Sequence, residues 1–259
     1  RRVLFRSYYF LMKTKPILGE AALLLQGEKK HLVITDLHVG FEDKLALNKI
    51  FVGKNTTLNE FIEKINSLID AEKPDSLVLL GDVKSGISSI TKSEWSDVPK
   101  LLAQLGNRID TILVPGNHDA NISHLIPDGI TMISSLGMII EDTLLTHGHT
   151  LPTQNLSQVS RIVMGHVHPV FFDEDSLLNG QRVWVSIKTQ KEKIFPSSSG
   201  ELEIIIVPSF NHYFYATKKK AYKKSISPII EKIKDASSAK IVTLDGTIIG
   251  DESILSQVI

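Results

Sequence analysis

The stretch Pro115-Gly116-Asn117-His118-Asp119 governs how the rest of this sequence is interpreted. It follows Thr111-Ile112-Leu113-Val114, a β-branched and apolar run that predicts a buried strand. Three polar side chains therefore stand where a strand ends, which is a rigid position for chemistry. Taken alone, the stretch also fits a simple turn, in which Pro-Gly makes the bend and Asn and Asp bond their own backbone. The remaining sequence has to separate these two interpretations.

Polar side chains recur at four further predicted strand ends. The strand His31–Thr35, the second of a predicted hairpin with Ala21–Leu25, is followed by Asp36 and His38, which share one face of an extended chain. For this pair alone, a polar strand terminus is the simpler interpretation. The runs Ser76–Leu80, Thr143–Thr146 and Arg161–Met164 lead to Asp82, to His147 and to His166 with His168. Five strand ends that carry donors of one chemical kind are hard to explain as turns alone.

Glycine precedes three of these polar residues, namely Asp82, Asn117 and His166. Glycine suits a backbone that turns sharply where no Cβ fits. The pattern therefore predicts close packing around the strand ends.

Two crossover helices are predicted between the early strands, over Thr56–Glu72 and Ser93–Leu105. The second helix is expected to turn one stripe toward the core: Trp95, Val98, Leu101, Leu102 and Leu105. Further strands are predicted at Met138–Ile140, Arg182–Ile187 and Leu202–Val207, with a closing hairpin over residues 241–249. Strands that alternate with helices predict an α/β fold.

Composition limits the classes of function. The chain has 259 residues, 29 Lys plus Arg, 29 Asp plus Glu, and no Cys. Equal charges give no overall basic field that would attract nucleic acid or membranes, and the lack of Cys excludes thiol catalysis and zinc ribbons. Apolar runs are far shorter than the ~20 residues that cross a bilayer. A cytoplasmic protein with no membrane partner is expected.

The first residues need separate treatment. Arg1–Ser7 matches what a common sequencing adapter would encode in frame, and the short apolar patch after it is below the ~7 to 15 residues of a signal-peptide core. We therefore expect residues 1–11 to be a non-native extension, with Met12 as the start, and residues 12–259 to form a single domain.

The strand-end donors suit a pair of borderline divalent metal ions. Seven residues carry carboxylate, amide or imidazole donors: Asp36, His38, Asp82, Asn117, His147, His166 and His168. This number is too large for one open catalytic site, but it suffices for two metals about 3.5 to 4 Å apart if one carboxylate bridges them. Asp82 is the candidate bridge. Mn²⁺ is expected first, with Fe²⁺, Zn²⁺ and Mg²⁺ as alternatives.

The ordered blocks D-x-H, G-D, G-N-H-D, H and G-H-x-H resemble the calcineurin-like metallophosphoesterase superfamily over roughly Leu32 to Pro169. The resemblance implies a two-sheet β-sandwich flanked by helices (αββα) and hydrolysis of phosphate esters by a metal-bound hydroxide. It also implies one metal on Asp36, His38, Asp82 and His168, and the other on Asp82, Asn117, His147 and His166. His118 is then the catalytic histidine, which stabilises a phosphoryl oxygen or protonates the leaving alkoxide.

Within the superfamily, residues 36–42, 80–84 and 207–211 resemble archaeal phosphoesterases related to SbcD and to the DNA-ligase-associated PdeM endonucleases. One departure is Lys84, where SbcD-type nucleases carry a histidine. Lys84 either neutralises a substrate phosphate from the rim or is an ordinary surface lysine.

Three features leave alternatives open. Asp119 either orients the imidazole of His118, which makes it a second catalytic candidate, or caps the turn. His149 either supports the metal ligands or lies on the surface. The segment from Tyr213 to Lys224 interleaves aromatics with five lysines, so it either contacts nucleic acid or is a solvated insertion.

The leading function is a phosphodiesterase or DNA nuclease, with a phosphate ester as substrate and DNA as one candidate. The alternatives are a small-molecule phosphatase, a cyclic nucleotide phosphodiesterase and, in another class, a non-catalytic metal-binding scaffold subunit.

Overall fold

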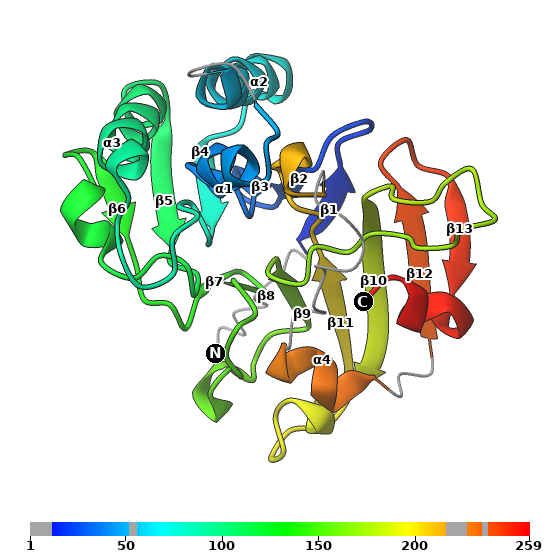
Figure 1. Ribbon diagram of the computed structural model, residues 1–259. Helices are drawn as coiled ribbons and strands as arrows, with labels where there is room; N and C mark the ends of the chain where they lie inside the picture. The colour runs from blue at the N-terminus through cyan, green and yellow to red at the C-terminus, as the bar shows by residue number, and fades with distance from the viewer. Residues whose placement is uncertain (1–11, 52–55, 216–226, 235–237) are drawn as a thin grey trace, which may run out of the picture.

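The apolar runs of the sequence form two β-sheets in the computed structural model, which describes residues 12–51, 56–215, 227–234 and 238–259. The first sheet has the strand order β1-β2-β3-β4-β5-β6, and the second has the order β13-β12-β10-β11-β9-β8-β7. Figure 1 shows helices on the outer sides of the two sheets. The expected α/β fold, a two-sheet sandwich flanked by helices, is confirmed.

The first sheet contains β1 (Lys13–Pro16), β2 (Leu23–Gln26), β3 (Lys30–Ile34), β4 (Ser76–Leu80), β5 (Asp110–Val114) and β6 (Ile130–Met132). Strands β1, β2 and β3 are antiparallel, which confirms the early hairpin, whereas β3 to β6 are parallel. The crossovers contain α2 (Thr56–Glu72) and α3 (Lys92–Gly106). Because parallel strands end at the same edge of a sheet, the polar ends of β3, β4 and β5 meet there.

The second sheet contains β7 (Met138–Ile140), β8 (Thr143–Thr146), β9 (Arg161–Met164), β10 (Val183–Gln190), β11 (Glu201–Ile206), β12 (Ser238–Thr243) and β13 (Ile248–Asp251). Strands β8, β9 and β11 are parallel, and β12 and β13 form the expected hairpin. Short helices complete the described chain: α1 (Phe41–Leu47), α4 (Pro228–Ile233) and the 3₁₀ helices η1 (Ile122–Leu125), η2 (Gln154–Leu156), η3 (Lys191–Lys193), η4 (His212–Tyr215) and η6 (Glu252–Gln257).

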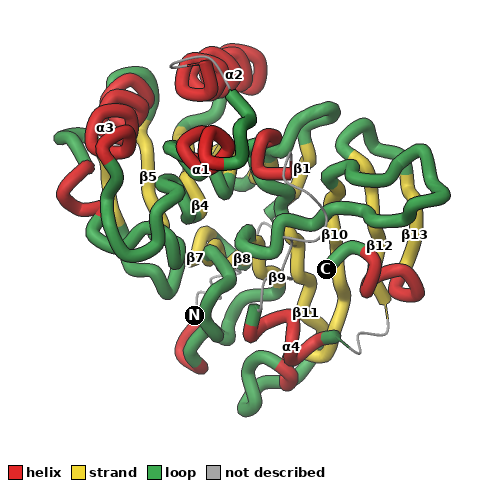
Figure 2. Tube along the Cα trace, in the orientation of Figure 1, coloured by secondary structure: helices red, strands yellow, loops and turns green. Residues whose placement is uncertain are grey.

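Side-chain alternation along the strands divides the interior into layers. In β4, Leu77 and Leu79 pack with residues of α2 and α3, whereas Val78 and Leu80 pack with Val163 of the second sheet. A further cluster lies between the second sheet and α4 with η6. The helices thus cover the outer faces while the strands lie inside, as Figure 2 shows. This packing holds the strand ends in fixed positions.

The structure corrects one expected core residue. Trp95 is 54% exposed, whereas Val98, Leu101, Leu102 and Leu105 are buried as predicted. At the first turn of α3 the neighbouring Glu94 is buried instead. Adjacent residues of a helix point about 100° apart, so the turn cannot bury both side chains against the same neighbour. Four elements of the structure were not expected from the sequence, namely β1, β6, α1 and α4.

Residues 1–11, which we expected to be a non-native extension, lie outside the described residues. Among the helices of the described chain, none combines the length and the apolar composition that a membrane crossing requires. The expected cytoplasmic location stays a prediction.

Candidate metal centre and active site

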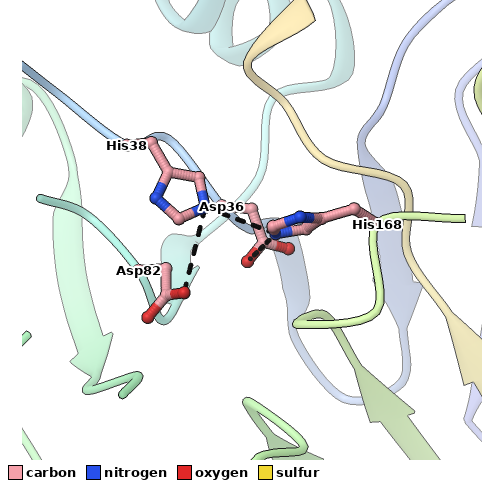
Figure 3. Close-up of side chains that lie close together, drawn as sticks. All are labelled: Asp36, His38, Asp82 and His168. Atoms are coloured by element: carbon pink, nitrogen blue, oxygen red, sulfur yellow. Dashed lines mark hydrogen bonds and ion pairs between the residues drawn. The ribbon is translucent and has the colours of Figure 1, made fainter. Parts of the chain in front are cut away.

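The loops that follow β3, β4, β8 and β9 bring six of the seven predicted donors together. Two groups of side chains have donor atoms within 4.8 Å of one another: Asp36, His38, Asp82 and His168 form the first, and Asp82, His147 and His166 the second. Figure 3 shows the first group, with His38, Asp82 and His168 pointing into one space beside Asp36. Asp82 belongs to both groups. Donors far apart in the sequence thus meet between the two sheets.

Five of these residues adopt a left-handed backbone that non-glycine residues rarely adopt. Their φ angles are 57° at Asp36, 46° at His38, 51° at Asp82, 69° at His166 and 49° at His168. Such conformations cost of order 1–3 kcal/mol each and are retained where the surroundings enforce them, often at functional sites. The fold therefore holds these side chains in place at the expense of backbone strain.

The carboxylate of Asp36 is fixed through one oxygen. Oδ2 accepts hydrogen bonds from the Thr35 hydroxyl at 2.9 Å and from the His166 amide at 3.1 Å. Oδ1 lies 2.9 Å from Nε2 of His168. Burial acts to raise the pKa of Asp36, but His168 and His147 outweigh it and lower the pKa to about 2. Asp36 is thus an anion with one oxygen directed into the site.

Asp82 has the same division between its two oxygens. Oδ1 accepts the backbone amide of His118 at 2.8 Å. Oδ2 lies 3.3 Å from Nε2 of His147 and 3.8 Å from Nε2 of His38, which belong to different groups. Burial opposes ionisation of this carboxyl, yet His147 and His38 hold its pKa well below the usual value. One ionised oxygen therefore faces both groups.

The imidazoles of His38, His147 and His168 direct their Nε2 atoms at the carboxylates of the centre. Nδ1 of His147 lies 2.9 Å from the carbonyl oxygen of Leu80, so Nδ1 carries a proton and Nε2 faces Asp82. Burial acts to lower the pKa of His147, but Asp82 and Asp36 raise it to about 9. Burial lowers the pKa of His38 to about 3 and that of His166 to about 4. Neutral imidazole is the form that binds metals, so His38 and His166 are already in that form, whereas His147 must release a proton when a metal binds.

Asn117 supplies a direct test of whether the site suits a cation. Its Oδ1 is buried and has no hydrogen-bond partner. A buried amide oxygen without a donor costs about 1–3 kcal/mol, unless a cation satisfies it. Together with carboxylate and imidazole donors, this oxygen matches the ligand chemistry of Mn²⁺, Fe²⁺ or Zn²⁺. The residues present therefore fit a divalent metal centre.

Glycine is required at the predicted positions because the ligands pack against it. A Cβ on Gly116 would overlap Oδ1 of Asp82 and lie 2.9 Å from Cδ2 of His147, and a Cβ on Gly81 would overlap the His147 ring. At Gly165, a Cβ would lie 2.7 Å from Oδ2 of Asp36. The prediction of close packing at these three glycines is confirmed.

His118 lies at the edge of the centre and is directed by a carbonyl group. Its Nδ1 lies 2.7 Å from the carbonyl oxygen of Ser85, and its Nε2 lies 3.9 Å from Oδ2 of Asp82. Its side chain is 16% exposed, whereas those of His38 and His147 are fully buried. His118 is thus oriented toward the centre and remains accessible to a substrate.

Asp119 contacts backbone amides and not the imidazole of His118. Oδ1 accepts from Val83 at 2.9 Å and from Lys84 at 3.2 Å, and Oδ2 accepts from Gly116 at 2.8 Å. Burial and the nearby Asp82 raise the pKa of this carboxyl to about 6. The bond to Gly116 corresponds to the turn-capping alternative, and the bonds to Val83 and Lys84 also hold the loop after β4.

Lys84 departs from both alternatives that the sequence left open. Its side chain is fully buried, so it is neither a surface lysine nor a rim residue. Nζ donates to the carbonyl oxygens of Gly86 and, at 3.4 Å, of Ser89. Burial lowers the pKa of Lys84, and the nearby charge of Glu94 acts against this. The side chain of Lys84 is therefore placed by the packing of the loop that begins at this residue.

His149 lies outside the two groups of donors. The His149 ring centroid is 5.4 Å from that of His147 and 6.1 Å from that of His166, and its Nδ1 is buried without a hydrogen-bond partner. At the start of the segment from Tyr213 to Lys224, the Tyr213 hydroxyl donates to Glu60 at 2.8 Å. Residues 216–226 lie outside the described residues.

Two residues that were not among the predicted site residues hold the loop of Asp36 and His38 in place. Nδ2 of Asn211 donates to the carbonyl oxygen of Leu37 at 2.9 Å, and the Ser209 hydroxyl donates to that of Asp36 at 3.0 Å. Asn211 and Ser209 are both fully buried. Their only signal in the sequence was a resemblance in residues 207–211, which did not indicate a contact with the loop of Asp36.

The match to a family model agrees with this geometry. A family model described as calcineurin-like phosphoesterase matches residues 29–180, a range that includes every predicted site residue. A nuclease of Pseudomonas putida, MPE, has a similar structure with a TM-score of 0.54 and 16% identity, covering 92% of this chain and 98% of its own. The E. coli phosphoesterase YfcE gives a TM-score of 0.39 at 16% identity, covering 85% and 97%. No curated protein matches the sequence.

Proposed function

Because the chain belongs to the calcineurin-like phosphoesterase family, and is thus a metal-dependent hydrolase of phosphate esters, we propose that it is a dinuclear phosphodiesterase or nuclease. The observation that carries the dinuclear proposal is the position of Asp82 in both donor groups, with Oδ2 facing His147 and His38. A single carboxylate oxygen between two groups of neutral or anionic donors is what a bridged metal pair requires.

The two groups, with Asn117 added to the second, define the proposed ligand sets. One metal is assigned to Asp36, His38, Asp82 and His168, and the other to Asp82, Asn117, His147 and His166. We propose Mn²⁺ as the metal, with Fe²⁺, Zn²⁺ and Mg²⁺ as competitors for the same donors. When bound, such cations supply Lewis acidity to the phosphate ester and make water a competent nucleophile near neutral pH.

The residues of the chain then divide the remaining work. His118, with Nδ1 on the Ser85 carbonyl and Nε2 toward the centre, is the group that donates a proton to the leaving oxygen or hydrogen-bonds a phosphoryl oxygen. Asp119 holds the loops of Val83 and Gly116 together and so supports His118 indirectly. Its proposed part in catalysis is positional.

The choice of a diester over a monoester rests on two weaker supports. The structural neighbour in Pseudomonas putida is a nuclease, although 16% identity shows a shared fold alone. Residues 36–42 and 80–84 resemble the SbcD-related and PdeM-like phosphoesterases. Contact of DNA with the segment from Tyr213 to Lys224 belongs to the same proposal.

We further propose that residues 12–259 form one domain, since Met12 packs in the cluster between the sheets.

The experiment that tests the function compares one purified protein on a panel of substrates. The panel contains a nitrophenyl diester, a nitrophenyl monoester, a cyclic nucleotide and single-stranded DNA, each with Mn²⁺, Mg²⁺ or Zn²⁺. Faster turnover of the diester and of DNA is expected. Turnover of monoesters alone would instead establish a phosphatase, and preference for the cyclic nucleotide a cyclic nucleotide phosphodiesterase. No turnover at full metal occupancy would favour the scaffold alternative.

A further inference from the structure

Two charged side chains next to the centre, Lys84 and Glu94, are fully buried. Lysine and glutamate are almost never fully buried unless their polar atoms are paired. Neither residue belongs to the two groups of candidate metal ligands. Their burial therefore calls for another role.

Both side chains hold the same glycine, from opposite sides of its backbone. Nζ of Lys84 donates to the carbonyl oxygen of Gly86, and the Glu94 carboxylate accepts the Gly86 amide at 2.5 Å. Glu94 also accepts the amide of Thr91 at 2.7 Å, which closes a capping box at the start of α3. A Cβ on Gly86 would lie 2.6 Å from the Ser89 carbonyl oxygen, so no other residue fits there. The loop over residues 85–90 is thus fixed to α3.

The position of Ser85 follows from this arrangement. Ser85 lies between Lys84 and Gly86, and its amide donates to the Val39 carbonyl at 3.0 Å. Its carbonyl oxygen accepts from Nδ1 of His118 at 2.7 Å and from Nζ of Lys44 at 3.0 Å. Because a carbonyl oxygen can only accept, Nδ1 of His118 carries a proton and Nε2 faces Asp82.

We propose that Lys84 and Glu94 are positioning residues for phosphate-ester hydrolysis, because they fix the Ser85 carbonyl that directs His118. The inference rests on the role of His118 in the proposed function. Neither side chain has a described contact with the ligand groups, so both act through the loop. A displacement of a reacting group by 1 Å can cost about 10²-fold in rate, so a small shift of Ser85 is enough to affect turnover.

The test uses two conservative variants and one control. Lys84→Met keeps most of the side-chain volume and removes the ammonium group, and Glu94→Gln keeps the shape and removes the charge. Both are expected to retain two metals per chain and to lose roughly 10- to 100-fold in kcat. The loss should be larger for a nucleotide diester, whose alkoxide needs a proton, than for a nitrophenyl diester. Lys92→Met, at an exposed position of α3, should leave kcat unchanged.

A double-mutant cycle separates this role from a general loss of structure. Adding Lys84→Met to His118→Ala should cause no further loss, because the lysine acts through that imidazole. Equal losses with and without His118, equal losses on both diesters, or loss of bound metal would overturn the inference. If Lys84→Met does not fold, as judged by its urea midpoint, Glu94→Gln carries the same cycle. Unchanged turnover in His118→Ala would refute the proposed function itself, whereas full turnover of Lys84→Met and Glu94→Gln beside an inactive His118→Ala refutes this inference alone.

Discussion

The backbone amide of His118 donates a hydrogen bond of 2.8 Å to Oδ1 of Asp82. This bond joins the loop after β5 to the loop after β4 and leaves Oδ2 of Asp82 facing His147 at 3.3 Å. The backbone of His118 therefore positions the shared carboxylate, whereas its imidazole is directed by the Ser85 carbonyl. Substitution of the two side chains should separate turnover from metal binding.

His118→Ala should abolish most turnover and keep the metals. The substitution removes the imidazole but keeps the amide that binds Asp82. A positioned general acid contributes typically 10²- to 10⁴-fold, so kcat should fall by about that factor. Steady-state kinetics and metal analysis of the same sample measure both effects. His124→Ala, which changes an exposed histidine, should have no effect. Unchanged catalysis in His118→Ala would show that another group is the acid.

Asp82→Asn should weaken both metals, because Asp82 belongs to both donor groups. His168→Ala should weaken only one, since His168 belongs to the first group alone. Metal titration followed by calorimetry distinguishes loss of two sites from loss of one. Asp128→Asn, at an exposed position, is the matched control. Full occupancy in Asp82→Asn would contradict a bridging role.

Asn211→Ala should reduce metal affinity although Asn211 is not a candidate ligand. The amide of Asn211 holds the Leu37 carbonyl, and Leu37 lies between Asp36 and His38, whose backbones are both left-handed. Loss of such a supporting contact typically costs 10- to 100-fold in metal affinity or activity. Competition with a chromogenic chelator measures the change, with the exposed Asn59→Ala as control. Equal metal affinity in the two variants would show that the loop of Asp36 and His38 keeps its conformation without Asn211.

The free energy of unfolding should depend on pH through His31. This histidine is buried in β3 with Nδ1 2.8 Å from the Ser76 hydroxyl, and burial lowers its pKa below the ordinary value of 6.5. The unfolded chain then binds the proton more readily, so the contribution of His31 to stability is present above about pH 6.5 and is lost as the pH falls through the lowered pKa.

His31→Gln removes this titration and can keep a hydrogen bond to Ser76. In urea unfolding, the free energy of unfolding of the variant should be closer to that of the unsubstituted chain at about pH 5 than at about pH 8. The exposed His124→Gln should show no such difference between the two pH values. If His31→Gln lowers the free energy of unfolding by the same amount at both pH values, the pH dependence does not come from His31.

Much of the fold could be predicted because strand and helix periodicity are local. The run Ser76–Leu80 predicted a strand buried on both faces, and Thr56–Glu72 predicted α2 with the observed bounds. Trp95 shows the limit of this reasoning: helical spacing placed it on the core stripe, but a hydrogen-bonded Glu94 takes the buried place at that turn. Helical periodicity predicts on which side of a helix a residue lies, but not which of two neighbouring side chains is buried there.

The sequence by itself determined which donors exist, their order, and their place at predicted strand ends, because Asp36, Asp82 and His147 each follow an apolar run whose length and residue types predict a strand. Only the tertiary structure decided what holds them: Ser85 against His118, Lys84 and Glu94 on one glycine, Asn211 on the loop of Asp36. Several of these contacts join residues far apart in the chain through single hydrogen bonds, for which no periodic pattern is needed. The residue types and their order thus follow from the sequence, whereas the geometry of the site depends on contacts between segments far apart in the chain.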